Sequence, residues 1–186
     1  MAKKMRKTKK KTILLGLTGS IAAYKTPFIA RELIKRGFNV FSIMTENARK
    51  FTTPFTMEAL TGNPCFINMF HLKGNSPYPH IALSKKADII VVAPATANFI
   101  AKAALGIADD LLTTIFLACD CPRLIAPAMN VKMYNSLQTR LNIKALKEKG
   151  VFVLPALKGS LACGDTGTGR MAEPGTIIKK ITAIIK

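Results

Sequence analysis

The chain has 186 residues, with 28 lysines and arginines against 10 aspartates and glutamates, and a formal net charge of +18 at pH 7. Hydrophobic residues make up 49% of the chain and its mean hydropathy is +0.23, which excludes a disordered polypeptide. No run approaches the roughly 18 to 20 apolar residues of a membrane-spanning helix, and the four cysteines include no paired C-x-x-C set typical of a zinc site.

The positive charge is concentrated at the start of the chain. Residues 1–11 carry seven of the 28 basic residues and no acid, so we expect a basic disordered tail there and one domain over residues 12–186. The remaining basic excess is read as a solvated face, because no recognised nucleic-acid motif is present. Salt-dependent DNA binding by the tail is a minor alternative. A phosphate-carrying ligand would also benefit from the positive field.

The amino-terminal region also resembles a secretory signal, because Ile13–Leu17 follows the basic residues. The apolar run is too short for one, and it ends at Thr18-Gly19-Ser20, where a strand-to-helix turn is expected. We therefore expect a cytoplasmic protein whose cysteines are free thiols.

The first part of the chain predicts a strand-helix-strand unit. Thr12–Thr18 is the first strand, Gly19-Ser20 the turn, Ile21–Arg36 a helix that Gly37 stops, and Phe38–Met44 the second strand. The turn places backbone N–H groups at a helix N-terminus, which suits a phosphate or ribityl group. It lacks the G-x-G-x-x-G dinucleotide fingerprint, so a plain turn is an equal alternative at this point.

The middle of the chain predicts shorter elements around one buried strand. Two short helical segments over residues 46–61 are broken at Thr52–Pro54, a turn and a weak strand cover 62–69, and a loop over 74–79 leads to His80 at the start of a helix. The apolar, β-branched run Ile89–Ala93 is typical of a strand buried on both faces of a parallel sheet. A loop over Pro94–Asn98 follows it.

The last part predicts alternating helices and strands. The expected elements are a helix to Gly106, a helix through Leu117 that Asp109 or Asp110 caps, a strand 123–126, a helix 131–149, a strand 151–154, an irregular glycine-rich segment 159–169 and an amphipathic helix 177–185. This order predicts an α/β fold with three layers, a doubly wound and mostly parallel sheet of the Rossmann or flavodoxin type.

Four predicted loops follow strands and therefore meet at one edge of the sheet. They are Gly19-Ser20, Thr45–Asn47, Pro94–Asn98 and Pro127–Asn130. They offer hydroxyls, amides and backbone donors with few charged groups. This composition suits a neutral, hydroxylated cofactor carrying a phosphate better than a metal or a nucleophilic triad, and we predict no metal site.

Six segments in order resemble the homo-oligomeric flavin-containing cysteine decarboxylases, and within that family the members that act on phosphopantothenoylcysteine. The segments are Gly19–Lys25, His80–Asp88, Ala93–Asn98, Gly106–Leu112, Pro127–Tyr134 and Ala162–Pro174. The resemblance covers nearly everything beyond the basic tail. One departure is Tyr134, where the family pattern often has tryptophan; tyrosine keeps an aromatic ring, so we expect the packing to survive.

The resemblance implies FMN bound at a subunit interface of a homo-oligomer built from trimers. It implies cofactor contacts from Gly19, Ser20, Ile21, Thr45, Asn47, Thr96, Ala97, Asn98 and Ala128. It implies catalytic roles for His80, Asn130 and Cys163, and substrate contacts from Asn130, Ala162, Cys163, Gly164, Asp165, Arg170 and Met171 in a flexible flap near the C-terminus. A separate phosphopantothenate-cysteine ligase would supply the substrate.

The chemistry explains these residue types. Loss of CO2 from cysteine leaves a carbanion, and oxidation of the thiol to a thioaldehyde by FMN gives its electrons a place to go. Asn130 would offer a neutral donor to the carboxylate, Cys163 would protonate the resulting ene-thiol before FMN returns hydride, and His80 would orient or deprotonate the substrate. The alternatives are a peptidyl-cysteine decarboxylase of the same family and a non-catalytic flavin-binding regulatory protein.

Overall fold

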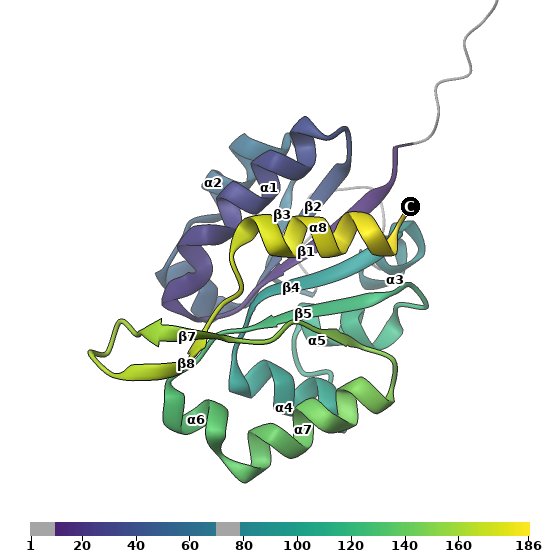
Figure 1. Ribbon diagram of the computed structural model, residues 1–186. Coiled ribbons are helices and arrows are strands. Elements are labelled where there is room, and N and C mark those ends of the chain that lie inside the picture. Colours follow the sequence, from purple (N-terminus) through teal and green to yellow (C-terminus); the bar gives the residue numbers. More distant parts are fainter. Residues whose placement is uncertain (1–9, 70–78) are drawn as a thin grey trace, which may run out of the picture.

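A six-stranded sheet forms the centre of the computed structural model, which describes residues 10–69 and 79–186. All its neighbouring strands pair in parallel, in the order β3-β2-β1-β4-β5-β6 (Figure 1). The strands are β1 (Thr12–Leu17), β2 (Asn39–Met44), β3 (Cys65–Phe66), β4 (Ile89–Ala95), β5 (Arg123–Pro127) and β6 (Phe152–Val153). From β1 the chain adds strands toward one edge of the sheet as far as β3, and from β4 it adds them toward the other edge. In such sheets a crevice opens outside the carboxyl ends of the two strands at this switch point, here β1 and β4.

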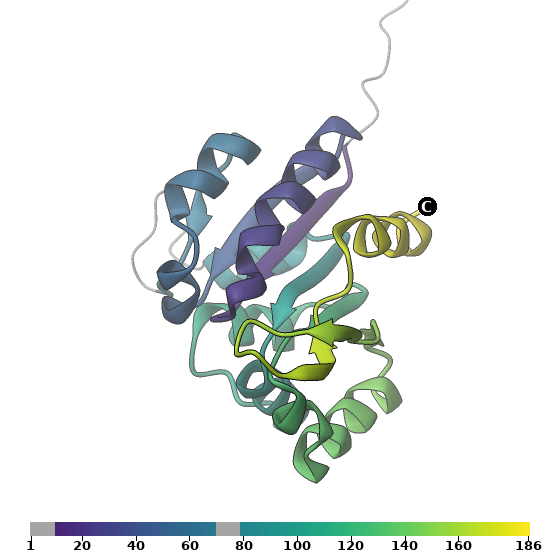
Figure 2. The ribbon, with the colours of Figure 1, turned by 60° about the vertical axis from the view of Figure 1, so that its left-hand side comes forward.

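Helices cover both faces of this sheet, as the two views in Figures 1 and 2 show. One face carries α1 (Thr26–Lys35), α2 (Pro54–Thr61) and α8 (Pro174–Ile184). The opposite face carries α3 (Pro79–Lys86), α4 (Ala97–Leu105), α5 (Leu111–Ala118) and α7 (Leu137–Glu148). The predicted three-layer, doubly wound architecture is confirmed.

The two central strands are buried along their whole length. In β1, Ile13 and Leu15 pack with the α1 and α8 side of the core, whereas Leu14 packs with the α4 and α5 side. Successive side chains of a strand point to opposite faces, so a strand covered on both faces must be apolar at every position. This requirement explains the unbroken apolar runs of β1 and β4.

The predicted helix over residues 21–36 is wrong in one respect, because it is two helices. A 3₁₀-helix, η1 (Ile21–Lys25), precedes α1. Thr26 is buried and its hydroxyl donates to the Ala93 carbonyl oxygen at 2.6 Å, which fixes the junction against β4. Pro27 has no N–H to donate and therefore suits the first turn of a new helix.

The predicted loop over Pro94–Asn98 is also wrong at both ends. Strand β4 continues through Ala95, which pairs with Pro127 after a register shift and accepts a hydrogen bond from Ala128 N at 3.0 Å. Thr96 is then the N-cap of α4, with its Oγ1 accepting from Phe99 N at 3.4 Å. Asn98 therefore lies in the first turn of a helix and not in a loop.

The predicted helix over residues 131–149 is broken at Ser136 into α6 (Val131–Asn135) and α7. The Ser136 hydroxyl donates to the Met133 carbonyl and accepts from Thr139 N, so it ends one helix and caps the next. The segment 159–169, predicted to be irregular, is instead part of an antiparallel hairpin of β7 (Leu157–Ser160) and β8 (Thr166–Arg170).

Several of the predicted helix ends and caps are confirmed. Gly37 and Gly150 follow α1 and α7 with φ of 86° and 80°, a conformation that favours glycine at helix ends. The expected break over residues 46–61 separates the short helix η2 (Glu46–Lys50) from α2, and Asp110 caps α5. Residues 74–78 of the predicted loop over 74–79 lie outside the described residues, and Pro79 is the first residue of α3. Residues 1–9 of the predicted tail also lie outside the described residues, while the Lys11 carbonyl accepts a backbone hydrogen bond from Asn39.

Candidate functional site

Two cavities lie side by side at the carboxyl edge of the sheet. The first, which we call the crevice, has a volume of about 400 Å³. Its walls come from the ends of β1, β2 and β4 and from the starts of α4 and α5. It is lined by Thr18, Gly19, Thr45, Glu46, Asn47, Thr96, Asn98, Phe99, Lys102, Asp110, Thr113 and Met133.

A buried hydroxyl holds the floor of the crevice together. Thr18 Oγ1 donates to the Pro94 carbonyl at 2.8 Å and accepts from Thr96 N at 3.0 Å. These two bonds join the end of β1 to the end of β4, at the point where the strand order reverses. The crevice is therefore fixed by the central strands themselves.

The rim of the crevice offers polar groups that the fold leaves available. Asn47 and Asn98 are exposed, and neither side chain forms a hydrogen bond to another described residue. Gly19 lies so close to Asn47 that a Cβ at position 19 would meet the Asn47 Cβ at 2.6 Å. The N-terminus of the nine-residue α4 also opens here, and its first N–H groups favour an anionic group. This donor set fits a ligand with hydroxyls and a phosphate.

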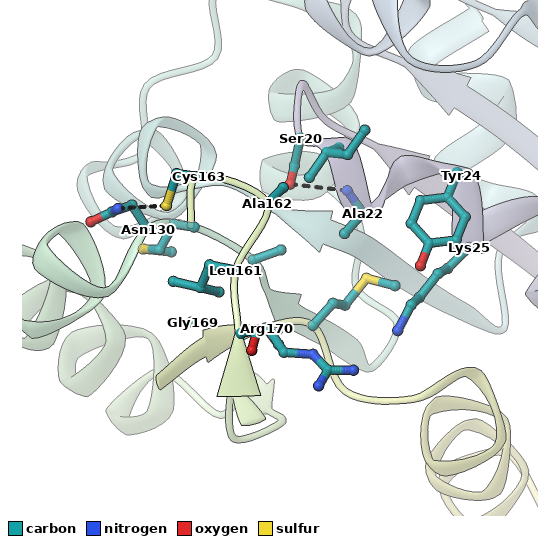
Figure 3. Close-up of a pocket in the computed structure, with 15 residues that line it drawn as sticks. Ser20, Ala22, Tyr24, Lys25, Asn130, Leu161, Ala162, Cys163, Gly169 and Arg170 are labelled. Carbon is teal, nitrogen blue, oxygen red and sulfur yellow. Dashed lines mark hydrogen bonds between the residues drawn. The ribbon is translucent and has the colours of Figure 1, made fainter. Parts of the chain in front are cut away.

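The second cavity, which we call the hairpin cavity, lies between η1 and the β7–β8 hairpin and has a volume of about 540 Å³ (Figure 3). Its lining is Ser20, Ile21, Ala22, Tyr24, Lys25, Ala128, Met129, Asn130, Ser160, Leu161, Ala162, Cys163, Gly169, Arg170 and Met171. The segments that enclose it are far apart in the sequence, and the fold brings them together at the ends of β1 and β5.

At one end of the hairpin cavity, three polar side chains form a connected cluster. Asn130 is the N-cap of α6, and its Oδ1 accepts from Lys132 N at 2.7 Å. This bond fixes the amide, whose Nδ2 donates to Cys163 Sγ at 3.2 Å and to Asp165 Oδ2 at 2.8 Å. Cys163 Sγ is 3.5 Å from the same carboxylate oxygen. An amide donor and an exposed thiol thus stand together at the tip of the hairpin.

Backbone contacts anchor the hairpin beside Asn130. Met129 N donates to the Gly169 carbonyl at 3.0 Å, and a Cβ on Gly169 would collide with the Met129 carbonyl oxygen. A Cβ on Gly167 would meet Val131 Cγ2 at 2.5 Å. Strand β8 can therefore pack on the loop after β5 only because both positions lack side chains.

At the opposite end of the hairpin cavity, Figure 3 shows the side chains of Tyr24, Lys25 and Arg170. Lys25 Nζ lies 3.0 Å from each carboxylate oxygen of Glu173, and Arg170 Nη2 lies 3.3 Å from one of them. The Lys25 side chain is only 15% exposed. This end carries positive charge, whereas the other end carries the amide and the thiol.

The predicted site residues divide between the two cavities. The crevice collects Gly19, Thr45, Asn47, Thr96 and Asn98. The hairpin cavity collects Ser20, Ile21, Ala128, Asn130, Ala162, Cys163, Arg170 and Met171. Ala97, Gly164 and Asp165 line neither, although Asp165 reaches Asn130. His80, the second residue of α3, also lines neither.

Sequence reasoning missed Tyr24 and Lys25 as lining residues. Both belong to the segment Gly19–Lys25 that the resemblance singles out, but they follow the strand end by several residues. A regular α-helix from Ile21 predicts no special place for them. The short 3₁₀-helix η1 is the feature that the sequence pattern did not indicate.

The other three cysteines differ from Cys163, which is exposed. Burial, with a smaller contribution from Glu58, raises the pKa of the Cys65 thiol to about 12. The hydrogen bond with Cys121 and burial raise the pKa of Cys119. In the part of the chain that the structure describes, no group of His, Cys, Asp and Glu side chains could hold a metal ion, and no helix is long and apolar enough to cross a membrane.

Comparison with known proteins adds independent findings. A family model described as "Flavoprotein" matches residues 1–186. The bifunctional coenzyme A biosynthesis protein CoaBC of Escherichia coli K12 is 43% identical over 173 residues, covering 93% of this chain and 43% of that protein. The chain therefore spans less than half the length of the bifunctional relatives. A probable phosphopantothenoylcysteine decarboxylase of Streptococcus mutans is 42% identical over 173 residues, covering 92% of this chain and 97% of that protein.

Solved structures show the same fold. A variant of PPC decarboxylase complexed with pantothenoylaminoethenethiol matches with a TM-score of 0.83 and 32% identity, covering 94% of this chain and 98% of the other. The FMN-dependent cysteine decarboxylase SpaF matches with a TM-score of 0.81 and 32% identity, covering 94% of this chain and 95% of the other. Both similarities therefore extend over almost the whole chain.

Proposed function

Since this chain belongs to the flavoprotein family, we propose that it decarboxylates phosphopantothenoylcysteine to phosphopantetheine with the help of bound FMN. The observation that carries the proposal is the cluster at the tip of the hairpin. The Asn130 amide and the Cys163 thiol are 3.2 Å apart in a cavity next to the crevice. Besides the cofactor, this reaction requires a group that binds the substrate carboxylate and a group that donates a proton to the substrate carbon.

The crevice residues would hold the FMN. Gly19, Thr45, Asn47, Thr96 and Asn98 line the crevice, and Ser20, Ile21 and Ala128 face the neighbouring hairpin cavity. Ala97 lines neither cavity, but it lies between Thr96 and Asn98 in the first turn of α4. The available amides of Asn47 and Asn98 suit ribityl hydroxyls, and the α4 N-terminus suits the phosphate. When bound, FMN would supply the reversible oxidation of the substrate thiol, without which the carbanion has no electron sink.

Asn130 would orient the substrate by its carboxylate. Its Oδ1 is committed to Lys132 N, so only Nδ2 is left to face the ligand. Both hydrogens of Nδ2 are used by Cys163 and Asp165 in this structure, and a substrate carboxylate would take the place of the Asp165 carboxylate. A neutral amide binds this carboxylate without the strong preference for the charged ground state that a cation would have.

Cys163 would deliver the proton that the substrate carbon needs after CO2 has left. Its thiol is at the tip of the hairpin, within reach of the group that Asn130 holds. The turn that carries it is closed by Leu161 N donating to the Asp165 carbonyl at 2.8 Å. The same hairpin covers the cavity and would limit the access of water, which competes for protonation.

His80 would act on substrate in a neighbouring subunit. It lies on α3 and lines neither cavity of its own chain. A homotrimer, or an assembly of several trimers, would bring the α3 helix of one subunit to the cavities of another. We also propose that residues 12–186 act as one flavoprotein domain in the cytoplasm, and that a phosphopantothenate-cysteine ligase supplies the substrate.

The test is direct. Purified protein is expected to be yellow, with the absorption of bound flavin, and to release CO2 from phosphopantothenoylcysteine. His80→Asn is expected to keep the flavin and lose turnover, and its matched control is Lys35→Gln on the outer side of α1. A colourless protein that neither binds added FMN nor releases CO2 would overturn the proposal.

A second candidate function is the decarboxylation of a C-terminal peptidyl cysteine, because SpaF is named an FMN-dependent cysteine decarboxylase without reference to phosphopantothenoylcysteine. Turnover of a cysteine-ended peptide and of phosphopantothenoylcysteine by the same preparation separates the two. Faster release of CO2 from the peptide would favour the second function. A yellow protein that turns over neither substrate would indicate a non-catalytic flavin-binding regulator.

A further inference from the structure

The hairpin cavity has two chemically different ends. Figure 3 shows Asn130 and Cys163 on one side of it and Tyr24, Lys25 and Arg170 on the other. Only the amide and thiol end is used by the reaction proposed above. The basic end belongs to the same continuous cavity of about 540 Å³, so one elongated ligand can reach both ends.

The basic end carries a net positive charge. Lys25 and Arg170 line the cavity and share a single carboxylate, that of Glu173. Glu173 is not part of the lining, and no acidic side chain of the described residues lines this cavity. The two cations are therefore only partly neutralised, and no carboxylate of the lining competes with a ligand for them.

Both cations are held in place before a ligand arrives. Lys25 is 15% exposed and makes two bonds of 3.0 Å to Glu173. Arg170 extends along the backbone of β7, where a Cβ on Gly159 would meet Arg170 Nη1 at 2.6 Å and Cδ at 3.0 Å. Side chains that are already ordered lose less conformational freedom when they bind.

We propose that Lys25 and Arg170, with the Tyr24 hydroxyl beside them, bind the phosphate ester group of the substrate. This inference rests on the proposed function, because it assigns the far end of the substrate whose carboxylate Asn130 holds. A guanidinium, an ammonium and a phenol supply several donors to the oxygens of a dianion. Glu173 positions the two cations from behind and leaves their other donors to the ligand.

The subsite gives the cavity a physical means of selecting its substrate. A phosphorylated substrate would be held at two ends, whereas a cysteine-ended peptide without an anionic group at the right distance would be held at one. The preference would be greatest at low ionic strength, because salt screens partly exposed charges. Arg170 is 41% exposed and Lys25 is less so, which makes Lys25 the stronger contributor.

The experiment measures binding of phosphopantetheine and of pantetheine, its form without phosphate, to the FMN-loaded protein by isothermal titration calorimetry. Wild type is expected to bind the phosphorylated compound about ten- to hundredfold more tightly, the range expected of charge-assisted hydrogen bonds. Lys25→Gln is expected to remove most of this preference while the Kd of pantetheine stays within about twofold. Arg170→Gln, on a different element, is expected to reduce the preference as well.

Lys35→Gln is the matched control. Lys35 also pairs with one glutamate, Glu32, at 2.9 Å, but it lies outside the cavity. It is expected to keep the full preference. The inference is overturned if wild type shows no preference, if Lys25→Gln and Arg170→Gln both retain it, or if either variant weakens both ligands equally. Failure of CO2 release with the binding preference intact would instead overturn the proposed reaction.

Discussion

The crevice and the hairpin cavity are neighbours, yet they are built in different ways. The crevice is enclosed by strand ends that are buried and hydrogen-bonded to one another, as Thr18 shows with its bonds to Pro94 and Thr96. The hairpin cavity is enclosed on one side by a two-stranded ribbon outside the main sheet, and residues 162–166 at its tip are exposed. The shape of the crevice can therefore change only if the core of the sheet rearranges.

The difference suggests a division of labour. A cofactor that stays bound needs walls that do not move, and the central strands supply them. A substrate that enters and leaves at every turnover needs a cover that can be displaced at little cost, and an exposed hairpin tip meets that need. Each of the following predictions changes one cavity and asks whether the other responds.

Cys163→Ser is expected to give the largest effect, and to affect the hairpin cavity without affecting the crevice. Loss of a positioned proton donor should lower turnover by about hundredfold or more, while the flavin absorption stays at the wild-type level because Cys163 does not line the crevice. Steady-state kinetics and the visible spectrum are the measurements. Cys65→Ser, at a thiol outside both cavities, is the control and should leave both unchanged.

Thiol labelling compares the open hairpin with the closed sheet edge. At pH 8, iodoacetamide is expected to modify Cys163 first, with Cys65 on the order of a hundredfold slower, because burial and Glu58 raise the pKa of Cys65 to about 12. Mass spectrometry of tryptic peptides gives the two rates. Equal rates would show that the hairpin is no more open than the sheet.

The raised pKa of Cys65 also affects the stability of the protein at high pH. Above the ordinary pKa of 9.0 the unfolded chain releases the Cys65 proton, whereas the folded chain retains it up to about 12. The unfolded state therefore binds fewer protons in this window, and the free energy of unfolding falls as the pH rises from 9 toward 12. Cys65→Ala should make that decline shallower in urea titrations at several pH values.

Thr18→Val tests the crevice alone. It removes a buried hydroxyl and leaves the Thr96 N–H without its partner, which should cost about 1–3 kcal/mol of stability and weaken FMN binding by about tenfold. Thr26→Val is the matched control, because Thr26 is also buried and bonds to the same strand at Ala93. It should lose similar stability and keep its FMN affinity. Equal loss of FMN in both variants would contradict the assignment of the crevice.

Asp165→Asn is expected to give the smallest effect, confined to the hairpin. It replaces a charged acceptor of Asn130 Nδ2 by a neutral one at an exposed site, where such pairs contribute less than about 1 kcal/mol. Amide hydrogen exchange at Leu161 and Gly164, whose N–H groups close the turn, should accelerate about two- to fivefold. Exchange in β1 should not change.

The sequence predicted the sheet better than it predicted the parts around it, for a physical reason. Strands buried on both faces must be apolar throughout, so β1 and β4 leave a pattern that can be read locally. The breaks at Thr26 and Ser136 depend on tertiary or capping bonds, such as Thr26 to Ala93, and these leave only weak local signals. The sequence predicts an irregular segment at the hairpin because glycines usually weaken strands, whereas Gly167 and Gly169 here allow close packing on Val131 and Met129.

The site followed the same rule. Residues directly at strand ends, such as Gly19 and Thr96, could be placed from the sequence because parallel strands share one edge. Lys25 and Tyr24 could not, because their position depends on the 3₁₀ geometry of η1. The proximity of Asn130 to Cys163 is a tertiary fact that only the resemblance suggested, since 33 residues separate them.

Position 169 shows how a site can be specified by an atom that is missing. The Gly169 backbone rests directly on the carbonyl of Met129, the residue before Asn130, and no side chain fits between them. The smallest addition, a methyl group, would push the ribbon outward and separate the thiol from the amide without touching either. The tolerance of this chain to mutation is therefore expected to be lowest at a residue that contributes no chemistry, and a search for the site by functional groups alone would pass over it.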